Sequence, residues 1–344
     1  MDIRKNRRIT IAVLSAAVLV LAAGIVVMLT KDSGKSGNIR AEEKTVFAMD
    51  AACTAKVWGA KPEIVTDEIS RLDGIFDCHK EDSQISRLNA DGGGTLSPEV
   101  RELLEESLGL TKQYPQTDIS VGALTKLWNV TGKDPKVPAD SEIQTALESC
   151  GYEKIRIQGD KCTLEDSAQL DVGAVAKGYA LDRAKQVLRQ SSAEAAVVSM
   201  GSSSLMYGKK PDGKDFTVAV TDPSNKQKQL LKFTTGECFV STSGGYERYF
   251  EADGKRYIHI LDITTGRPVQ TDITSATVIC ASGLRSDQLS TAVFIGGTKK
   301  LSEFFADDSI QIIAVDTQGN IHISEELEDK ITLEDTQHKI IVEK

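Results

Sequence analysis

The sequence predicts a single α+β domain with antiparallel sheets flanked by helices, preceded by an N-terminal transmembrane helix. Apolar residues follow helical spacing mainly before residue 191, and alternation with a period of two dominates after it. Helices followed by antiparallel strands, without a repeat or an internal low-complexity linker, indicate one domain of the α+β class. At 344 residues and 40% hydrophobic composition, the chain can bury a substantial core.

The N-terminal stretch Ile9–Thr30 contains no charged residue and, at 22 residues, is long enough to span a bilayer. Four basic residues precede it and two follow closely, so the positive-inside rule places residues 1–8 in the cytoplasm and the domain outside. The approach to Ile25 resembles a lipoprotein cleavage site, but an isoleucine stands where the acylated cysteine would be. We expect an uncleaved single-pass membrane anchor, with signal-peptide cleavage as the alternative. A flexible tether over 31–44 and a catalytic domain over 45–344 follow it.

The charge balance excludes one class of ligand. The chain carries a net charge of −9, yet its first 35 residues carry +4, so the remainder carries −13. An acidic body argues against nucleic acid, whose binding requires clustered Lys and Arg to neutralise phosphates. Acidic residues would suit metal binding, although an acidic surface is more often only a matter of solubility.

The six cysteines show no short paired spacing, which disfavours a zinc site and a Cys-x-x-Cys redox pair. An exported location permits disulfides, whereas the apolar surroundings of several cysteines equally suit buried free thiols. The sequence leaves their pairing open. They are Cys53, Cys78, Cys150, Cys162, Cys238 and Cys280.

The first half of the domain reads as one strand region, three helices and a hairpin. Residues 45–59 are strand-like, and apolar residues at 65, 69, 72 and 76 form the stripe of a helix packed on a core. Ser97 is expected to cap a second helix with Pro98 at its first position. A short helix covers 143–147, and a hairpin over 154–164 turns at Gly159-Asp160.

The second half reads mainly as strands. A helix is expected over 286–295, and a closing hairpin over 310–324. Asp253-Gly254 marks a hairpin turn. The expected strands are 195–200, 216–221, 230–233, 239–242, 246–251, 257–262 and 275–281.

The stretch 170–184 organises the rest of the chain, because it looks like a strand that delivers a helix N-terminus. Gly173 and Gly178 bracket a run of small residues there. A helix N-terminus favours phosphate, and small side chains let a ligand approach the backbone closely. Asp171 and Lys177 could contact a metal or a polar group of a ligand, although simple packing is the commoner explanation of such a turn.

Three further clusters carry groups that could perform chemistry. Asp287 and Thr291 lie four residues apart on one helix face and offer the oxygen ligands that Mg²⁺ accepts; a helix-start acid and a buried Thr are the alternative. The loop 241–245 could present N–H and O–H donors to an anion or be merely a turn. His259 lies in an apolar-alternating stretch, where it is a candidate general base or a core imidazole.

Taken together, these stretches resemble the FAD:protein FMN transferase family, the ApbE-type flavin transferases. The resemblance covers nearly all of residues 45 to 300. It implies an ApbE-like fold related to the T-fold and a transfer of FMN from FAD to a Thr hydroxyl of an acceptor protein, which releases AMP. The segments that carry it are 47–49, 82–89, 117–122, 127–128, 170–184, 199–201, 241–250, 257–268 and 286–297.

The resemblance also implies roles for individual residues. It assigns Mg²⁺, with Mn²⁺ possible, to the backbone carbonyl of Ala174 and to the side chains of Asp287 and Thr291. His259 and Asp287 are the expected catalytic residues, with His259 as the base. The residues expected to contact the flavin nucleotide are Met49, Thr117, Asp118, Asp171, Lys177, His259 and Leu261.

Expected partners are FAD and acceptor flavoproteins carrying a target Thr, either subunits of membrane redox complexes or extracytoplasmic FMN-binding domains. Two alternatives remain at this point. An enzyme of the same fold could hydrolyse FAD to FMN and AMP, or the chain could be a non-catalytic flavin-binding protein.

Overall fold

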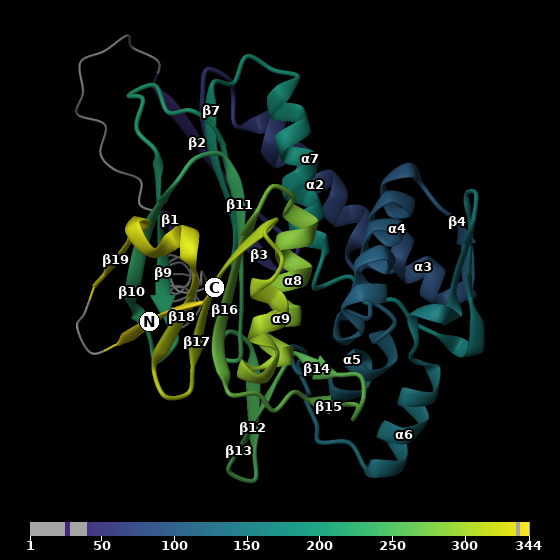
Figure 1. Cartoon of the computed structure of the whole chain (residues 1–344). Coiled ribbons are helices and arrows are strands. Elements are labelled where there is room, and N and C mark those ends of the chain that lie inside the picture. Colours follow the sequence, from purple (N-terminus) through teal and green to yellow (C-terminus); the bar gives the residue numbers. More distant parts are fainter. Residues whose placement is uncertain (1–24, 28–39, 335–337, 344) are drawn as a thin grey trace, which may run out of the picture.

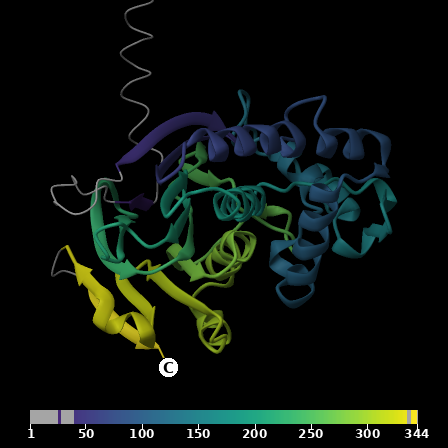
Figure 2. The same ribbon diagram turned by 90° about the horizontal axis from the view of Figure 1, so that it is seen from above.

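The computed structural model describes residues 25–27, 40–334 and 338–343. Its centre is a nine-stranded sheet in the order β2-β3-β7-β8-β11-β16-β17-β18-β20. A four-stranded sheet in the order β1-β9-β10-β19 covers one face of it, and the long helices α2, α7 and α8 cover the other. Helices α3 to α6 form a lobe beyond this helical layer (Figure 1). Figure 2 shows the three layers from above.

The helices and 3-10 turns lie mainly before residue 190 and again between residues 283 and 330. They are α2 Glu63–Phe76, α3 Gln84–Asp91, α4 Pro98–Gln113, η1 Pro115–Thr117, α5 Gly122–Trp128, α6 Asp140–Ser149, η2 Tyr152–Lys154, η3 Glu165–Ser167, α7 Ala176–Arg189, α8 Gly283–Gly296, η4 Thr298–Lys300, α9 Leu301–Phe305 and η5 Glu325–Lys330.

The strands pair antiparallel with one described exception, β18 with β20. They are β1 Ile25–Val27, β2 Ala41–Ala48, β3 Ala51–Trp58, β4 Gly93–Thr95, β5 Ile155–Gln158, β6 Lys161–Leu164, β7 Ala195–Met200, β8 Ser203–Gly208, β9 Phe216–Asp222, β10 Asn225–Thr235, β11 Cys238–Gly244, β12 Tyr249–Ala252, β13 Lys255–Ile258, β14 Leu261–Asp262, β15 Arg267–Pro268, β16 Ile273–Cys280, β17 Ile310–Asp316, β18 Asn320–Ser324, β19 Ile331–Leu333 and β20 Lys339–Glu343.

The central sheet carries apolar side chains on both faces because a layer packs on each. On β11, Val240 packs against the small sheet together with Val218, whereas its neighbour Phe239 packs on the helical side with Leu284. Successive residues of a strand point to opposite faces, so one strand contributes to two cores. The same strand also carries Ser241 and Ser243, so the sheet and the helical layer both contribute polar groups to the site described below.

Much of the expected secondary structure is confirmed. Helix α2 buries Ile69, Leu72 and Phe76, and the side chain of Ser97 caps α4 by accepting a hydrogen bond from the N–H of Val100 at 3.3 Å. The hairpin β5–β6, most of the expected strands of the second half and the closing hairpin β17–β18 are also present. The expected α+β class with sheets flanked by helices therefore holds.

Three expected strands are wrong in whole or in part. The expected strand 246–251 begins only at Tyr249, as β12, because residues 245–248 form a turn. The residues before α7 form an irregular segment with one isolated bridge at Gln169, because backbone groups there bond to Asn89 and Ile119 instead of a strand partner. The expected strand 257–262 is divided into β13 and β14, and His259 lies between them. Alternating apolar residues predicted a continuous strand, but only the ends of this segment have ladder partners.

The predicted anchor over 9–30 lies outside the described residues except for Ile25–Val27. These three residues form strand β1, paired with β9, instead of continuing a helix. Among the described helices, none is long and apolar enough to cross a membrane. The predicted tether over 31–44 overlaps β2, which begins at Ala41, so the ordered domain starts earlier than residue 45. All six cysteines are described, and all are free thiols.

Candidate active site

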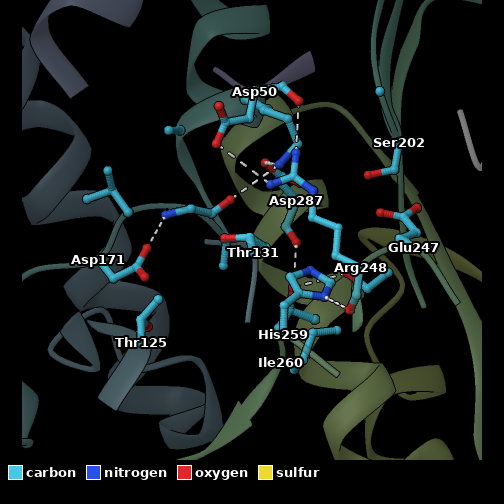
Figure 3. Close-up of a pocket in the computed structure, with 18 of the residues that line it drawn as sticks. Asp50, Thr125, Thr131, Asp171, Ser202, Glu247, Arg248, His259, Ile260 and Asp287 are labelled. Carbon is cyan, nitrogen blue, oxygen red and sulfur yellow. Dashed lines mark hydrogen bonds and ion pairs between the residues drawn. The ribbon is translucent and has the colours of Figure 1, made fainter. Parts of the chain in front are cut away.

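One cavity of about 360 Å³ opens where the helical layer meets the ends of the central strands. Its walls come from the β2–β3 turn, the segment before α7, the loop after β11, the segment between β13 and β14, and α8. Figure 3 shows side chains from these segments pointing into one space. All site residues predicted from the sequence line it, namely Met49, Thr117, Asp118, Asp171, Ala174, Lys177, His259, Leu261, Asp287 and Thr291.

The segment before α7 is held in place by hydrogen bonds from two neighbouring elements. The amide side chain of Asn89, on α3, donates to the carbonyl of Leu170 at 2.9 Å and accepts from its N–H at 2.7 Å. The N–H of Asp171 donates to the carbonyl of Ile119 at 2.8 Å. Asp171 Oδ1 then accepts from the N–H of Gly173 at 2.8 Å, so the turn is fixed without a strand partner.

Asp287 is buried between α8 and α7, and three groups contact its carboxylate. Oδ2 accepts a hydrogen bond from the N–H of Gly178 at 2.9 Å, and Oδ1 accepts from Ser203 Oγ at 3.0 Å. Lys177 Nζ lies 3.7 Å from Oδ2 and donates to the carbonyl of Gly173 at 3.3 Å. Lys177 therefore links the turn that carries Ala174 to the carboxylate of Asp287.

The N-terminus of α8 is fixed by Asp182, a partly buried acid on α7. Its carboxylate accepts from the N–H groups of Gly283 at 2.8 Å and Leu284 at 2.7 Å. Burial raises the pKa of this carboxyl, and the two N–H donors oppose that rise. An acid at a helix N-terminus satisfies unpaired amides and complements the helix dipole. Asp182 thereby sets the position of the turn on which Asp287 lies.

Thr291 lies one turn after Asp287 on the same face of α8. Its Oγ1 is 3.1 Å from Ser243 Oγ, at the end of β11. Ser243 Oγ is also 2.8 Å from Ser290 Oγ. The expected donor loop 241–245 is therefore the end of a strand, and its hydroxyls contact α8 directly.

His259 is held by the backbone of Arg248. The backbone N–H of His259 donates to the Arg248 carbonyl at 3.1 Å, and the ring Nδ1 of His259 lies 3.2 Å from the same oxygen. Burial, with the positive charges of Arg248 and Lys177, lowers the pKa of the imidazole to about 4. A neutral imidazole that donates its Nδ1–H to this carbonyl has a free lone pair on Nε2.

The guanidinium of Arg248 closes the rim of the cavity against Asp50. It donates to the backbone carbonyl of Asp50 at 2.9 Å, and the carboxylate of Asp50 lies 3.8 Å from it (Figure 3). Met49 and Asp50 both have positive φ, 51° and 55°. The N–H of Met49 donates to Asp73 Oδ1 at 2.6 Å, which holds this turn.

The remaining predicted contacts form the opposite wall. Asp118 is 4% exposed, and burial raises the pKa of its carboxyl. Its Oδ1 accepts from the N–H of Ser120 at 2.8 Å, whereas Oδ2 has no hydrogen-bond partner among the described residues. Thr117 Oγ1 accepts from the amide of Gln288 at 3.0 Å. Leu261 is buried in an apolar cluster with Trp128.

Sequence reasoning missed Glu247, whose side chain points into the cavity (Figure 3). Its Oε1 is buried and has no hydrogen-bond partner in the part of the chain that the structure describes. Burial raises the pKa of this carboxyl to about 7, against the opposing charges of Lys177 and Arg248. The expected strand 246–251 contains two acids, Glu247 and Glu251, and the sequence does not show which of them is buried. An acid in a buried segment requires an explanation, and that was the available signal.

The oxygen groups of the cavity fit a small hard cation. Asp287, Thr291 and Ala174 all line it, and they carry a carboxylate, a hydroxyl and a backbone carbonyl. No cluster of three or more His, Cys, Asp or Glu side chains that could cage a metal is found within residues 25–27, 40–334 and 338–343. A cation with few protein ligands is typical of Mg²⁺, which keeps waters and substrate phosphates in its coordination shell.

The fold and the site together define an α+β enzyme whose cavity suits a phosphate-bearing ligand. The chain belongs to the ApbE family, whose model matches residues 49–314. It is an enzyme of the transferase class.

Two curated relatives named FAD:protein FMN transferase illustrate the similarity. The protein from Treponema pallidum is 28% identical over 325 residues, which cover 84% of this chain and 90% of the relative. A protein from Klebsiella pneumoniae is 30% identical over 240 residues, covering 67% of this chain and 74% of the relative.

Solved structures extend the similarity to the fold. The ApbE protein from Thermotoga maritima superposes with a TM-score of 0.78 at 29% identity, covering 83% of this chain and 98% of that one. The apo flavinyl transferase ApbE from Pseudomonas stutzeri gives 0.74 at 28% identity, covering 83% and 94%. The predicted family and the expected ApbE-like fold are thus confirmed.

Proposed function

We propose that this chain is a Mg²⁺-dependent FAD:protein FMN transferase. It moves the FMN part of FAD to a Thr hydroxyl of an acceptor protein, leaves a phosphoester-linked flavin and releases AMP. The observation that carries the proposal is that residues from segments up to 242 positions apart, Met49 to Thr291, line one cavity. They bring oxygen ligands, an ammonium group and an imidazole to the same space.

Asp287, Thr291 and the carbonyl of Ala174 would hold Mg²⁺ in this proposal, and Mn²⁺ accepts the same kinds of ligand. The bound cation would neutralise charge on the diphosphate oxygens of FAD. Lys177 would also neutralise charge on the diphosphate, because it lines the cavity and its ammonium group lies 3.7 Å from Asp287. Phosphoryl transfer depends mainly on positioning and on stabilising this charge.

His259 would act as the base for the acceptor hydroxyl. The hydroxyl proton moves to Nε2 while its oxygen forms a bond to the FMN phosphorus. The bond from that phosphorus to the bridging oxygen breaks, and AMP leaves with the electron pair. The Arg248 carbonyl, 3.2 Å from Nδ1, supports this role because it favours the tautomer with a free Nε2.

Mass spectrometry of an acceptor incubated with this chain, FAD and Mg²⁺ tests the proposal. A covalent FMN adduct on a Thr of the acceptor, with one AMP released per adduct, is the expected result. Release of free FMN and AMP without an adduct would instead assign FAD hydrolysis. If FAD stays intact after long incubation, the chain is a non-catalytic flavin-binding protein. Suitable acceptors are subunits of membrane redox complexes and extracytoplasmic FMN-binding domains.

We also propose that the uncharged N-terminal stretch, of which Ile25–Val27 pair with β9 in this structure, anchors the chain in the cell membrane with the domain on the outer face. The uncharged 22-residue stretch and the basic residues before it support this placement. Protease added to intact cells should then degrade the domain, whereas resistance until the membrane is broken would contradict the proposal.

A further inference from the structure

Hydroxyl groups on β11 meet hydroxyl groups on α8 at the wall of the cavity, which Ser243 and Thr291 line. Ser241 Oγ lies 2.9 Å from Ser286 Oγ, and Ser243 Oγ lies 2.8 Å from Ser290 Oγ. The two serines of β11 share one face because they are alternate residues of a strand, and the two serines of α8 are one turn apart. The second pair continues to Thr291, whose Oγ1 is 3.1 Å from Ser243 Oγ.

The carbonyl of Asp287 determines the direction in which these hydroxyls donate. Ser290 Oγ lies 2.9 Å from that oxygen, which can only accept, so Ser290 uses its single proton there. Ser243, 2.8 Å from Ser290 Oγ, then donates to Ser290. The remaining contact requires Thr291 to donate to Ser243.

The opposite direction fits the distances less well. It would require Thr291 to donate to the Asp287 carbonyl over 3.5 Å, longer than a normal O–H···O hydrogen bond. It would also leave Ser290 Oγ and the same carbonyl oxygen 2.9 Å apart without a proton between them. The short contact therefore selects the chain that runs from Thr291 through Ser243 and Ser290 to the carbonyl.

We propose that Ser243 and Ser290 are positioning residues that turn the proton of Thr291 away from the cavity. The lone pairs of Thr291 Oγ1 then face the cavity, as binding of a cation requires. Groups behind a metal ligand fix its orientation and its affinity in the same way. The inference rests on the proposed function, which assigns a divalent cation to Asp287 and Thr291.

Binding of Mn²⁺ to the full chain without FAD tests this inference, with free Mn²⁺ measured by electron paramagnetic resonance. Ser243→Ala should weaken binding by about tenfold, the lower end of the effect of losing a group behind a metal ligand. Ser243→Thr keeps the hydroxyl and should restore binding. Ser241→Ala is the matched control: it lies on the same face of β11, and Ser286 keeps its bond to the Gly283 carbonyl at 2.9 Å.

A second variant covers the case in which Ser243→Ala does not fold. Ser290→Ala removes the group that accepts the proton of Ser243. Ser243 can then donate to Thr291 instead of accepting from it, so Mn²⁺ binding should again weaken. Equal Mn²⁺ affinity of wild type and both alanine variants overturns the inference, as does an equal loss in Ser241→Ala. Absence of Mn²⁺ binding by the wild type overturns the metal site of the proposed function instead.

Discussion

The backbone N–H of Gly178 donates a hydrogen bond to the carboxylate of Asp287 at 2.9 Å, where α7 and α8 cross. The helices approach this closely because neither carries a side chain at the crossing. A Cβ atom on Gly178 would overlap the carbonyl of Gly283, and one on Gly283 would overlap the carbonyl of Gly178. Two glycines 105 positions apart therefore bring the turn before α7 and the acid of α8 to one cavity.

Gly178→Ala should destabilise the chain and disturb the position of Asp287 at the same time. The new methyl group would meet backbone at Gly283 and lie 2.7 Å from Asp287 Cβ, so the helices must separate. Overpacking of this kind costs roughly 1–3 kcal/mol. Thermal unfolding and Mn²⁺ affinity measure the two effects.

Gly74→Ala is the matched control for that substitution. Gly74 is an exposed residue of α2, and a methyl group added to it would have no atom within 4 Å. Alanine there should stabilise the helix by about 0.5–1 kcal/mol. An unchanged melting temperature in Gly178→Ala would contradict the account of the helix crossing.

His259→Ala should lower the turnover of transfer while FAD affinity stays close to that of the wild type. The proposed role of His259 is to take a proton in the reaction, and general-base catalysis contributes roughly 10²- to 10⁴-fold to a rate. Single-turnover formation of the flavin adduct gives the rate, and fluorescence titration gives FAD affinity. Equal turnover in the variant would remove the assignment.

Local patterns in the sequence predicted much of the fold and placed Asp287 and Thr291 on one face of a helix. The helix stripe of α2 and the cap at Ser97 depend on neighbouring residues, so a single sequence reveals them. Asp287 and Thr291 were predicted from their spacing together with the family resemblance. The structure adds Gly178 and Ser203 as partners of Asp287, which come from other elements.

The parts that the sequence did not predict depend on contacts across the fold. Asn89 holds the segment before α7 from 81 positions away, so an apolar alternation there indicated a strand that does not form. Glu247 lay inside a predicted strand, but the structure places it in the turn between β11 and β12, where it lines the cavity. Alternation identifies extended backbone, but it does not identify which backbone groups find a strand partner.

Glu247→Gln should change how stability depends on pH. The folded-state pKa of Glu247 is raised from an ordinary 4.5 to about 7, so its stabilising contribution is complete below about pH 4.5 and declines as pH rises through 7. The glutamine variant lacks this decline. It should melt close to wild type at pH 5 and at least about 2 °C higher at pH 8, where roughly 2–4 °C corresponds to 1 kcal/mol.

Calorimetry with a chelator present measures this difference without any contribution from a bound cation. Glu251→Gln removes the same charge from an exposed position on β12 and is the control. It should shift the melting temperature equally at both pH values. A parallel shift in Glu247→Gln would mean that this carboxyl is ionised at pH 5 in the folded chain.

Asp182→Ala should weaken both the fold and the binding of Mn²⁺, although Asp182 is not predicted to touch the cation. Its carboxylate accepts the N–H groups of Gly283 and Leu284, and loss of a helix cap costs about 0.5–2 kcal/mol. The first turn of α8 would then fray, and Asp287 lies on the next turn. Ser97→Ala removes a comparable cap from α4, so it should lower the melting temperature without changing Mn²⁺ affinity. If both variants lower stability alike and neither changes Mn²⁺ affinity, the start of α8 does not determine the position of Asp287.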